Sequence, residues 1–206
     1  MVAAALCGGD IYSNYMTDTI GAIILAAGYS KRYGSIKLCA KLANGNTVLG
    51  QTIQRIKAAV SATIVITQPD VAPRLAGLGT DIKVFHQAQH GMGATLAYGI
   101  GLVTDWDACL VCLGDMPFIK SATYRQIVSC LTSKSIVNPI YQSRTGNPVG
   151  FGQQFFEQLQ QLSGDTGARS VIQNNQKSVI DVPVDDAAIL HDIDTPADLS
   201  RYQAVE

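Results

Sequence analysis

The amino-acid sequence predicts an α/β protein with a mostly parallel sheet and helices on both faces of that sheet. Short apolar runs alternate with amphipathic segments nearly to the end of the chain, a rhythm that favours strand–helix–strand crossovers. Two of the runs, 22–27 and 109–114, are continuously apolar, which is typical of central strands covered on both faces. No repeat, low-complexity linker or composition break divides the 206 residues. We therefore expect one domain at 19–206, preceded by a flexible extension at 1–18.

The expected strands are short and apolar, and turn residues separate them from the helices. They lie at 22–27, 63–67, 82–86, 109–114, 136–141, 148–151 and 178–184. The expected helices lie at 46–60, 91–103, 121–131, 154–162, 166–175 and 195–203.

Three of the expected helices carry recognisable start signals. Asn46 or Thr47 can cap the helix over 46–60, whose apolar side consists of Val48, Ile53, Ile56 and Val60. Ser121 is expected to cap the helix that follows it. Thr195 followed by Pro196 predicts a cap and a first helical residue for the last helix.

The composition argues against a nucleic-acid or membrane partner. Hydrophobic residues make up 47% of the chain and charged residues 15%, with a net charge of -1. A near-neutral chain lacks the basic surface that binds nucleic acid or anionic lipid, and no run approaches the ~20 apolar residues of a spanning helix. Any anion site must therefore be a local feature.

The five cysteines, Cys7, Cys39, Cys109, Cys112 and Cys130, favour a reducing compartment. Their number is odd and their spacing irregular. Cys109 and Cys112 form a C-x-x-C, but positions three apart on a strand point to opposite faces, so we expect buried thiols and no shared metal. The N-terminal stretch has no positive start before its apolar residues, which makes it a poor signal peptide. We expect a cytoplasmic protein.

A small-residue loop follows the first expected strand, in "LAAGYSKRYGSIK" (25–37). Gly28 and Gly34 permit a close approach of the backbone to a ligand, while Arg32 and Lys37 can supply positive charge to a phosphate. The spacing does not fit a Walker A loop. From the spacing alone, a phosphate loop and a surface loop with solvated basic residues are equally acceptable.

Carboxylates stand where two other segments change direction. Asp115 ends the most apolar run, in "CLGDMP", and Pro117 then takes the backbone out of regular pairing. Ligands of parallel sheets bind at the carboxyl ends of strands, so Asp115 is a candidate Mg²⁺ ligand rather than a turn aspartate. Asp192 and Asp194, in "DIDTPADL", would share one side if extended and could diverge in a turn.

Two further glycine-rich turns, "HGMG" (90–93) and "SGDTGAR" (163–169), each lead into an expected helix. Either could present N–H groups to an anion, or serve only as a loop. His86, His90 and His191 have no convincing catalytic partner in the sequence, and no nucleophile elbow is present. Covalent catalysis is not expected.

These motifs together resemble a known family. "LAAGYSKRYGSIK" is similar to the L-A-A-G-x-S-x-R-x-G-x-x-K signature of nucleotidyltransferases. "HGMGATL", "CLGDMP", "RTGNPVGF", "LSGDTGAR" and "DIDTPADL" follow in the order found in molybdenum cofactor cytidylyltransferases of the MobA/MocA-like family. The resemblance spans about residues 20 to 202. It implies a three-layer Rossmann-like nucleotidyltransferase fold and the transfer of CMP from CTP to the terminal phosphate of molybdopterin, with Mg²⁺ as cofactor and release of pyrophosphate.

The resemblance also implies roles for individual residues. Catalysis would rest on Arg32, Lys37 and Asp115, and Mg²⁺ on Asp115 with Asp192 or Asp194. The pterin side would be lined by Asn147, Asp165 and Arg169. The nucleotide would contact Leu25, Ala26, Ala27, Gly28, Arg32, Gly34, Lys37, Gly91, Met92 and Gly93. The implied partners are CTP, a molybdopterin-type cofactor, and a molybdenum hydroxylase or its chaperone.

Ala27 bears on the choice of nucleotide, because relatives that use guanine carry a glycine there. Two residues depart from the family pattern: Tyr33 replaces a methionine, and Asn147 replaces the histidine of R-x-G-H-P. The second departure puts the acceptor in question. The alternatives are a GTP-dependent or sugar-phosphate nucleotidyltransferase of the same fold and a non-catalytic module that delivers the cofactor.

Overall fold

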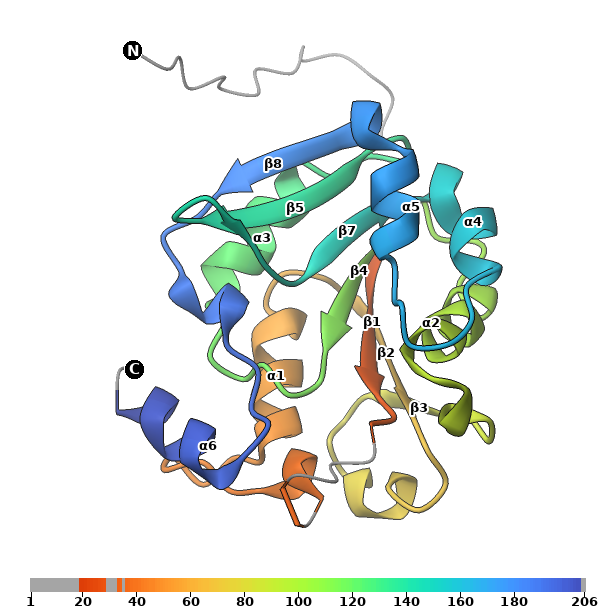
Figure 1. Cartoon of the computed structure of the whole chain (residues 1–206). Helices are drawn as coiled ribbons and strands as arrows, with labels where there is room; N and C mark the ends of the chain where they lie inside the picture. Colours follow the sequence, from red (N-terminus) through yellow and green to blue (C-terminus); the bar gives the residue numbers. More distant parts are fainter. Residues whose placement is uncertain (1–18, 29–32, 35, 205–206) are drawn as a thin grey trace.

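The computed structural model describes residues 19–28, 33–34 and 36–204. The extension expected at 1–18 lies outside the described residues, as does Arg32. Within the described part, an eight-stranded sheet is covered by helices on both faces (Figure 1). The predicted fold class is therefore confirmed.

The parallel half of the sheet is built from the first four strands. They are β1 (Ile20–Ala26), β2 (Ala62–Thr67), β3 (Asp81–Val84) and β4 (Ala108–Leu113). Their order is β3-β2-β1-β4, and each neighbouring pair is parallel. The two continuously apolar runs are thus both internal strands of the sheet, as predicted.

The remaining strands extend the sheet beyond β4 with mixed directions. These strands are β5 (Ile136–Tyr141), β6 (Arg144–Thr145), β7 (Val149–Gly152) and β8 (Val179–Pro183). β7 lies antiparallel between β4 and β5, β6 pairs antiparallel with β5, and β8 pairs parallel with β5. The two-residue strand β6 is the one strand that the sequence did not predict, because two exposed residues leave no apolar pattern.

Alternate residues of β1 face two different helical layers. Ala22, Ile24 and Ala26 belong to the core beneath α1 (Val48–Lys57) and α3 (Ser121–Ser129). Ile23 and Leu25 belong to the core beneath α2 (Met92–Gly101), α4 (Phe156–Gln160) and α5 (Arg169–Asn174). Each fully buried isoleucine stabilises the fold by about 2 kcal/mol, so this strand anchors both layers.

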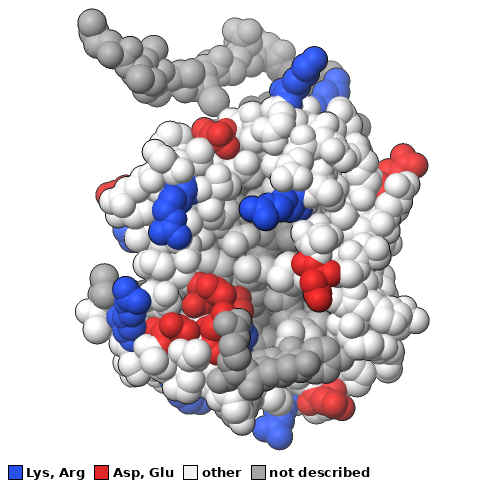
Figure 2. Space-filling view, in the orientation of Figure 1, with Lys and Arg blue, Asp and Glu red and all other residues white. Residues whose placement is uncertain are grey.

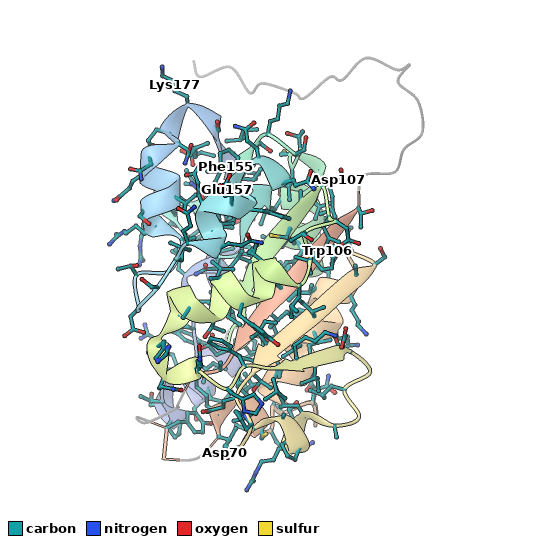
Figure 3. All side chains as sticks on the ribbon, turned by 90° about the vertical axis from the view of Figure 1, so that its right-hand side faces the viewer. Asp70, Trp106, Asp107, Phe155, Glu157 and Lys177 are labelled. Atoms are coloured by element: carbon teal, nitrogen blue, oxygen red, sulfur yellow. The ribbon has the colours of Figure 1, made fainter. Side chains whose placement is uncertain are left out.

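Figure 3 shows α2 and α4 lying over the sheet on the second of these faces. Trp106, which precedes β4, packs so closely there that a Cβ at Gly21 would stand 2.1 Å from its ring. This strand position therefore requires glycine. Of the C-x-x-C pair, Cys109 belongs to the core under α2 and Cys112 to the core under α1. The prediction of two buried thiols on opposite faces is confirmed.

The helix starts agree with the sequence in two cases out of three. Thr47 caps α1, and its hydroxyl accepts a hydrogen bond from the N–H of Gly50 at 3.0 Å. Thr195 caps α6 (Pro196–Gln203), with Pro196 as the first helical residue. The prediction for Ser121 is wrong, since the cap is Lys120 and Ser121 is already helical. The carboxylate of Asp186, distant in sequence, accepts from the N–H of this cap residue at 2.8 Å and from the hydroxyl of Thr123 at 2.6 Å, which fixes the start of the helix without a side-chain cap.

Candidate functional site

The site lies at the carboxyl ends of β1 and β4, where two strands and the C-terminal segment meet. The N–H of Gly114 donates to the carbonyl of Leu25 at 2.9 Å, which continues the β1–β4 pairing just past the end of β4. The N–H of Ile193 donates to the carbonyl of Asp115 at 3.0 Å. This second bond holds the 192–194 segment against the end of β4. The two bonds join residues that are 89 and 78 positions apart in the sequence.

Asp115, Asp192 and Asp194 form an acidic cluster, which we call the aspartate cluster. One carboxylate oxygen from each lies within 4.8 Å of the others. Figure 2 shows acidic side chains gathered at the edge of a hollow on this face of the molecule. The two aspartates of the 192–194 segment therefore converge on Asp115, which resolves the alternative left open by the sequence.

Lys37, the first residue of a short 3-10 helix (Lys37–Cys39), inserts its ammonium group into the aspartate cluster. Its Nζ donates to Asp115 Oδ2 at 2.6 Å and to Asp194 Oδ1 at 3.1 Å, and only 12% of the lysine side chain is exposed. Burial alone would lower the pKa of Lys37, but the charges and hydrogen bonds of the two aspartates outweigh burial and raise it. Lys37 is therefore protonated at neutral pH.

The aspartate cluster fits a divalent cation. Asp115 Oδ1 is buried and has no hydrogen-bond partner within the described residues, although its other oxygen binds Lys37. Burial raises the pKa of Asp192, and the negative charges of Asp194 and Asp115 raise it further. A hard cation that binds oxygen ligands would reduce the repulsion among the three carboxylates. It would also give the unpaired oxygen of Asp115 a partner.

A cavity of about 440 Å³ lies beside the aspartate cluster, and we call it the first cavity. Among the predicted nucleotide contacts, Leu25, Ala26, Ala27, Gly28, Lys37, Gly91 and Met92 line it. Leu38, Ala88, Thr95 and Leu113 also line it and were not predicted. Gly34 and Gly93 are not lining residues within the described part of the chain. The sequence motifs thus converge on one cavity, while the apolar residues that complete it carry no motif.

The two remaining glycine-rich turns pack against each other at the rim of the first cavity. Gly91 has φ +97°, and a Cβ there would lie 2.4 Å from Asp165 Oδ1. The N–H of Gly93 donates to the carbonyl of Gly164 at 2.7 Å, and Asp165 Oδ1 accepts from the N–H of Met92 at 3.3 Å. Glycine is required in "GMG" because the "SGDTGAR" backbone lies directly against it.

A second cavity of about 650 Å³ adjoins the first, and Leu25, Met92 and Leu113 line both. Asn147 and Arg169 line this second cavity, whereas Asp165 lines the first. Much of the wall is apolar, with Val111, Val149, Phe151, Ile172 and Val179 among the lining residues. The three residues assigned to the acceptor by resemblance are thus divided between two adjoining cavities.

Comparison with known proteins gives the family. Residues 22–179 match the model of the MobA-like NTP transferase domain. The chain belongs to this family. None of the helices in the described part of this MobA-like chain has the length and apolar character that crossing a membrane requires.

Among solved structures, the MobA-like chain is similar to Rv0371c from Mycobacterium tuberculosis H37Rv, at 27% identity and a TM-score of 0.80, over 91% of this chain and 98% of that one. A complex of Rv0371c with manganese also matches, at 26% identity and a TM-score of 0.77, over 91% of this chain and 100% of that one. A nucleotidyl transferase from Methanothermobacter thermautotroptrophicus (Mth528) matches at 22% identity and a TM-score of 0.79, over 91% and 97% of the chains. At that identity the last likeness shows the fold alone.

Among curated proteins, the bifunctional protein GlmU of Syntrophomonas wolfei subsp. wolfei is 28% identical over 138 residues. The match covers 65% of this chain but only 30% of GlmU. The chain therefore spans about a third of the length of this relative.

Proposed function

We propose that this protein is a nucleotidyltransferase that transfers CMP from CTP to the terminal phosphate of molybdopterin and releases pyrophosphate. The observation that carries the proposal is the aspartate cluster with Lys37, at the carboxyl ends of two central strands and beside a cavity lined by Leu25 to Gly28. The motif order, the family, and the solved structure of a similar protein with manganese support it.

The proposed reaction makes one phosphorus–oxygen bond and breaks another. An oxygen of the acceptor phosphate attacks the α-phosphorus of CTP in line, and the bond to the bridging oxygen of pyrophosphate breaks. A phosphate nucleophile is largely ionised at neutral pH, so no strong general base is needed. The absence of an evident base–nucleophile pair in the sequence is consistent with this chemistry.

The main barrier to the reaction is the approach of two polyanions, and the residues of the site are suited to lowering it. Asp115, Asp192 and Asp194 would hold Mg²⁺, which supplies charge neutralisation and Lewis acidity at phosphate oxygens. Lys37 would exchange its aspartate contacts for triphosphate oxygens as the nucleotide binds. Arg32, assigned to the triphosphate by resemblance, lies outside the described residues. Leu25 to Gly28 would lie against the base and ribose, with Ala27 favouring cytosine.

The second cavity would hold the pterin part of the acceptor. Asn147 and Arg169 line this cavity, and Leu25, Met92 and Leu113 join it to the proposed nucleotide cavity. An acceptor lying there would extend toward the aspartate cluster. A molybdenum hydroxylase or its chaperone would then receive the product.

The decisive test is pyrophosphate release with molybdopterin, Mg²⁺ and each of the four nucleoside triphosphates in turn. We expect turnover with CTP and little with the others. A preference for GTP would replace the cytidylyl assignment with guanylyl transfer, and turnover with a sugar phosphate instead of molybdopterin would replace the acceptor. Tight CTP binding without turnover would favour a non-catalytic module that delivers the cofactor.

A further inference from the structure

Asn138 is a polar residue at a core position of β5. Its neighbours Ile136 and Val137 are fully buried and face the α2 side and the α1 side of the sheet, respectively. By strand alternation Asn138 shares the face of Ile136, where it is 5% exposed and lines the second cavity. An apolar residue would be expected at such a position, so the amide needs an explanation.

The hydrogen bonding of Asn138 does not supply a structural explanation. Its Oδ1 is buried without a hydrogen-bond partner within the described residues. Its Nδ2 donates to Asp181 Oδ1 at 3.4 Å, a long contact that contributes little. A buried amide with an unpaired oxygen stabilises a fold less than a well-packed apolar side chain does. Fold stability therefore does not account for Asn138.

Asp181 lies directly beside Asn138 on the neighbouring strand. The two residues are register partners in the parallel pairing of β5 with β8. Asp181 is exposed, and its side chain also lines the second cavity. The amide N–H of Asn138 thus directs its weak hydrogen bond to one carboxylate oxygen of Asp181 on the α2 side of the sheet, which leaves the other oxygen for a ligand.

The second cavity gives Asp181 a distinctive setting. Among the described residues that line it, Asp181 is the only acid and Arg169 the only base. The apolar lining residues Val149, Ile172 and Val179 are partly exposed and suit the faces of a flat ring system. A carboxylate beside such a wall accepts hydrogen bonds from donors on the ring edge.

We propose that Asp181 is a specificity-determining residue that accepts hydrogen bonds from the ring-edge N–H groups of a heterocyclic acceptor, and that Asn138 is the positioning residue that orients it. This proposal rests on the proposed function, in which a pterin phosphate occupies the second cavity. A pterin carries an exocyclic amine beside a ring N–H, two adjacent donors that match the acceptor oxygens of a carboxylate. Arg169 would then serve the anionic part of the same molecule.

Two commercially available compounds, pterin and lumazine, distinguish recognition of ring-edge donors by Asp181 from non-specific binding in the second cavity. Pterin carries the exocyclic amine, whereas lumazine has a carbonyl in its place and a hydrogen on the adjacent ring nitrogen N1; both keep the ring N3–H. Both fluoresce, so their binding to the full chain can be followed by a change in emission without any turnover. We expect the wild-type protein to bind pterin at least about tenfold more tightly than lumazine, because a carbonyl would face the carboxylate.

Two variants carry the test. In Asp181→Asn and in Asn138→Val, the preference for pterin should fall to within about threefold of unity, since the acceptor oxygens are replaced or no longer oriented. The melting temperature of Asn138→Val should equal or exceed that of the wild type, because an unpaired amide is removed from the core. Asp81→Asn, which removes an exposed carboxylate from the distant strand β3, is the matched control and should keep the wild-type preference.

Failure of this inference can be told apart from failure of the proposed function. Equal binding of the two probes by the wild type, saturable binding of neither, or a preference that survives in both variants would overturn the role of Asp181. A marked fall in the melting temperature of Asn138→Val would assign Asn138 to the fold instead. If the preference for pterin is present but CTP does not support pyrophosphate release, the proposed reaction fails while the pterin site stands.

Discussion

The first and second cavities share three lining residues and yet differ sharply in charge. Lys37 and four aspartates line the first cavity, whereas Asp181 and Arg169 are the only charged residues among the described residues that line the second. Concentrated charge is suited to a triphosphate and its metal ion, because electrostatics can neutralise and orient phosphate groups. An apolar wall with a few directional groups is suited to discriminating among ring systems. Under the proposed function, the first cavity would serve the chemistry and the second the choice of acceptor.

Replacing Asp115 should have the largest effect and should act on the first cavity alone. We expect Asp115→Asn to lower turnover by about 100-fold or more, because a metal ion stabilises developing charge by several kcal/mol. The fold should persist, since one carboxylate oxygen has no partner and Lys37 keeps Asp194. Pyrophosphate release and circular dichroism measure the two quantities.

The matched control for this variant is Asp105→Asn, which makes the same charge change at an exposed position outside both cavities. Its turnover should equal that of the wild type. Wild-type activity in Asp115→Asn would remove this residue from the mechanism.

Replacing Lys37 should weaken nucleotide binding and should lower the stability of the protein when no metal ion is bound. Without its ammonium group, three carboxylates remain close together, and the loss of a largely buried ion pair costs about 1–3 kcal/mol. We expect Lys37→Ala to melt at a lower temperature in EDTA, to recover much of this loss in Mn²⁺, and to raise the KM for CTP about tenfold.

The exposed pair of Lys83 with Asp81, 3.0 Å apart, provides the comparison. Lys83→Ala should change neither the KM nor the response to Mn²⁺, because surface ion pairs contribute little. If Lys37→Ala behaves in the same way, its loop has no role in phosphate binding.

Ala27 offers a smaller test, of nucleotide preference. The resemblance links a glycine at this position to guanine, and Ala27 is 7% exposed and lines the first cavity. Ala27→Gly should shift the ratio of kcat/KM for CTP over GTP by roughly tenfold toward GTP, about the effect of one methyl group in a pocket. The exposed Ala43→Gly should leave the ratio unchanged. An unaltered ratio in Ala27→Gly would show that this residue does not contribute to base selection.

The first cavity was largely predictable from the sequence, and the second was not. Glycine turns, Lys37 and the aspartates stand in short local motifs that can be recognised in the sequence. The convergence of Asp192 and Asp194 on Asp115 needed the structure, since it depends on the backbone bond from Ile193 to Asp115.

The lining of the second cavity comes from separate strands and helices, and no short pattern encodes it. Asn138 and Asp181 lie 43 positions apart and become neighbours only through the register of β5 with β8. The one available signal was a polar residue inside the apolar run "IVNPIY". The start of α3 likewise depends on a distant residue, because Asp186 accepts from the N–H of Lys120, and no local motif near Ser121 encodes that contact.

The smallest expected effect tests whether the start of α6 supports the aspartate cluster. Asp198 Oδ2 accepts hydrogen bonds from the N–H of Thr195 at 2.7 Å and from the N–H of Asp194 at 3.2 Å. Asp198→Asn should lower the free energy of unfolding by about 1 kcal/mol, as loss of a helix cap does, and should weaken Mn²⁺ binding a few-fold.

The pH dependence of this variant follows from the sign of a pKa shift. Hydrogen bonding from Thr195 lowers the pKa of Asp198 from its ordinary value of 3.8. A carboxyl group with a lowered pKa adds stability above its unfolded-state pKa and loses it as the pH falls through the folded-state pKa. The difference in unfolding free energy between the wild type and Asp198→Asn should therefore be largest near neutral pH and shrink in acid. A difference that stays constant with pH would mean that Asp198 acts through packing, and the aspartate cluster would then not depend on its charge.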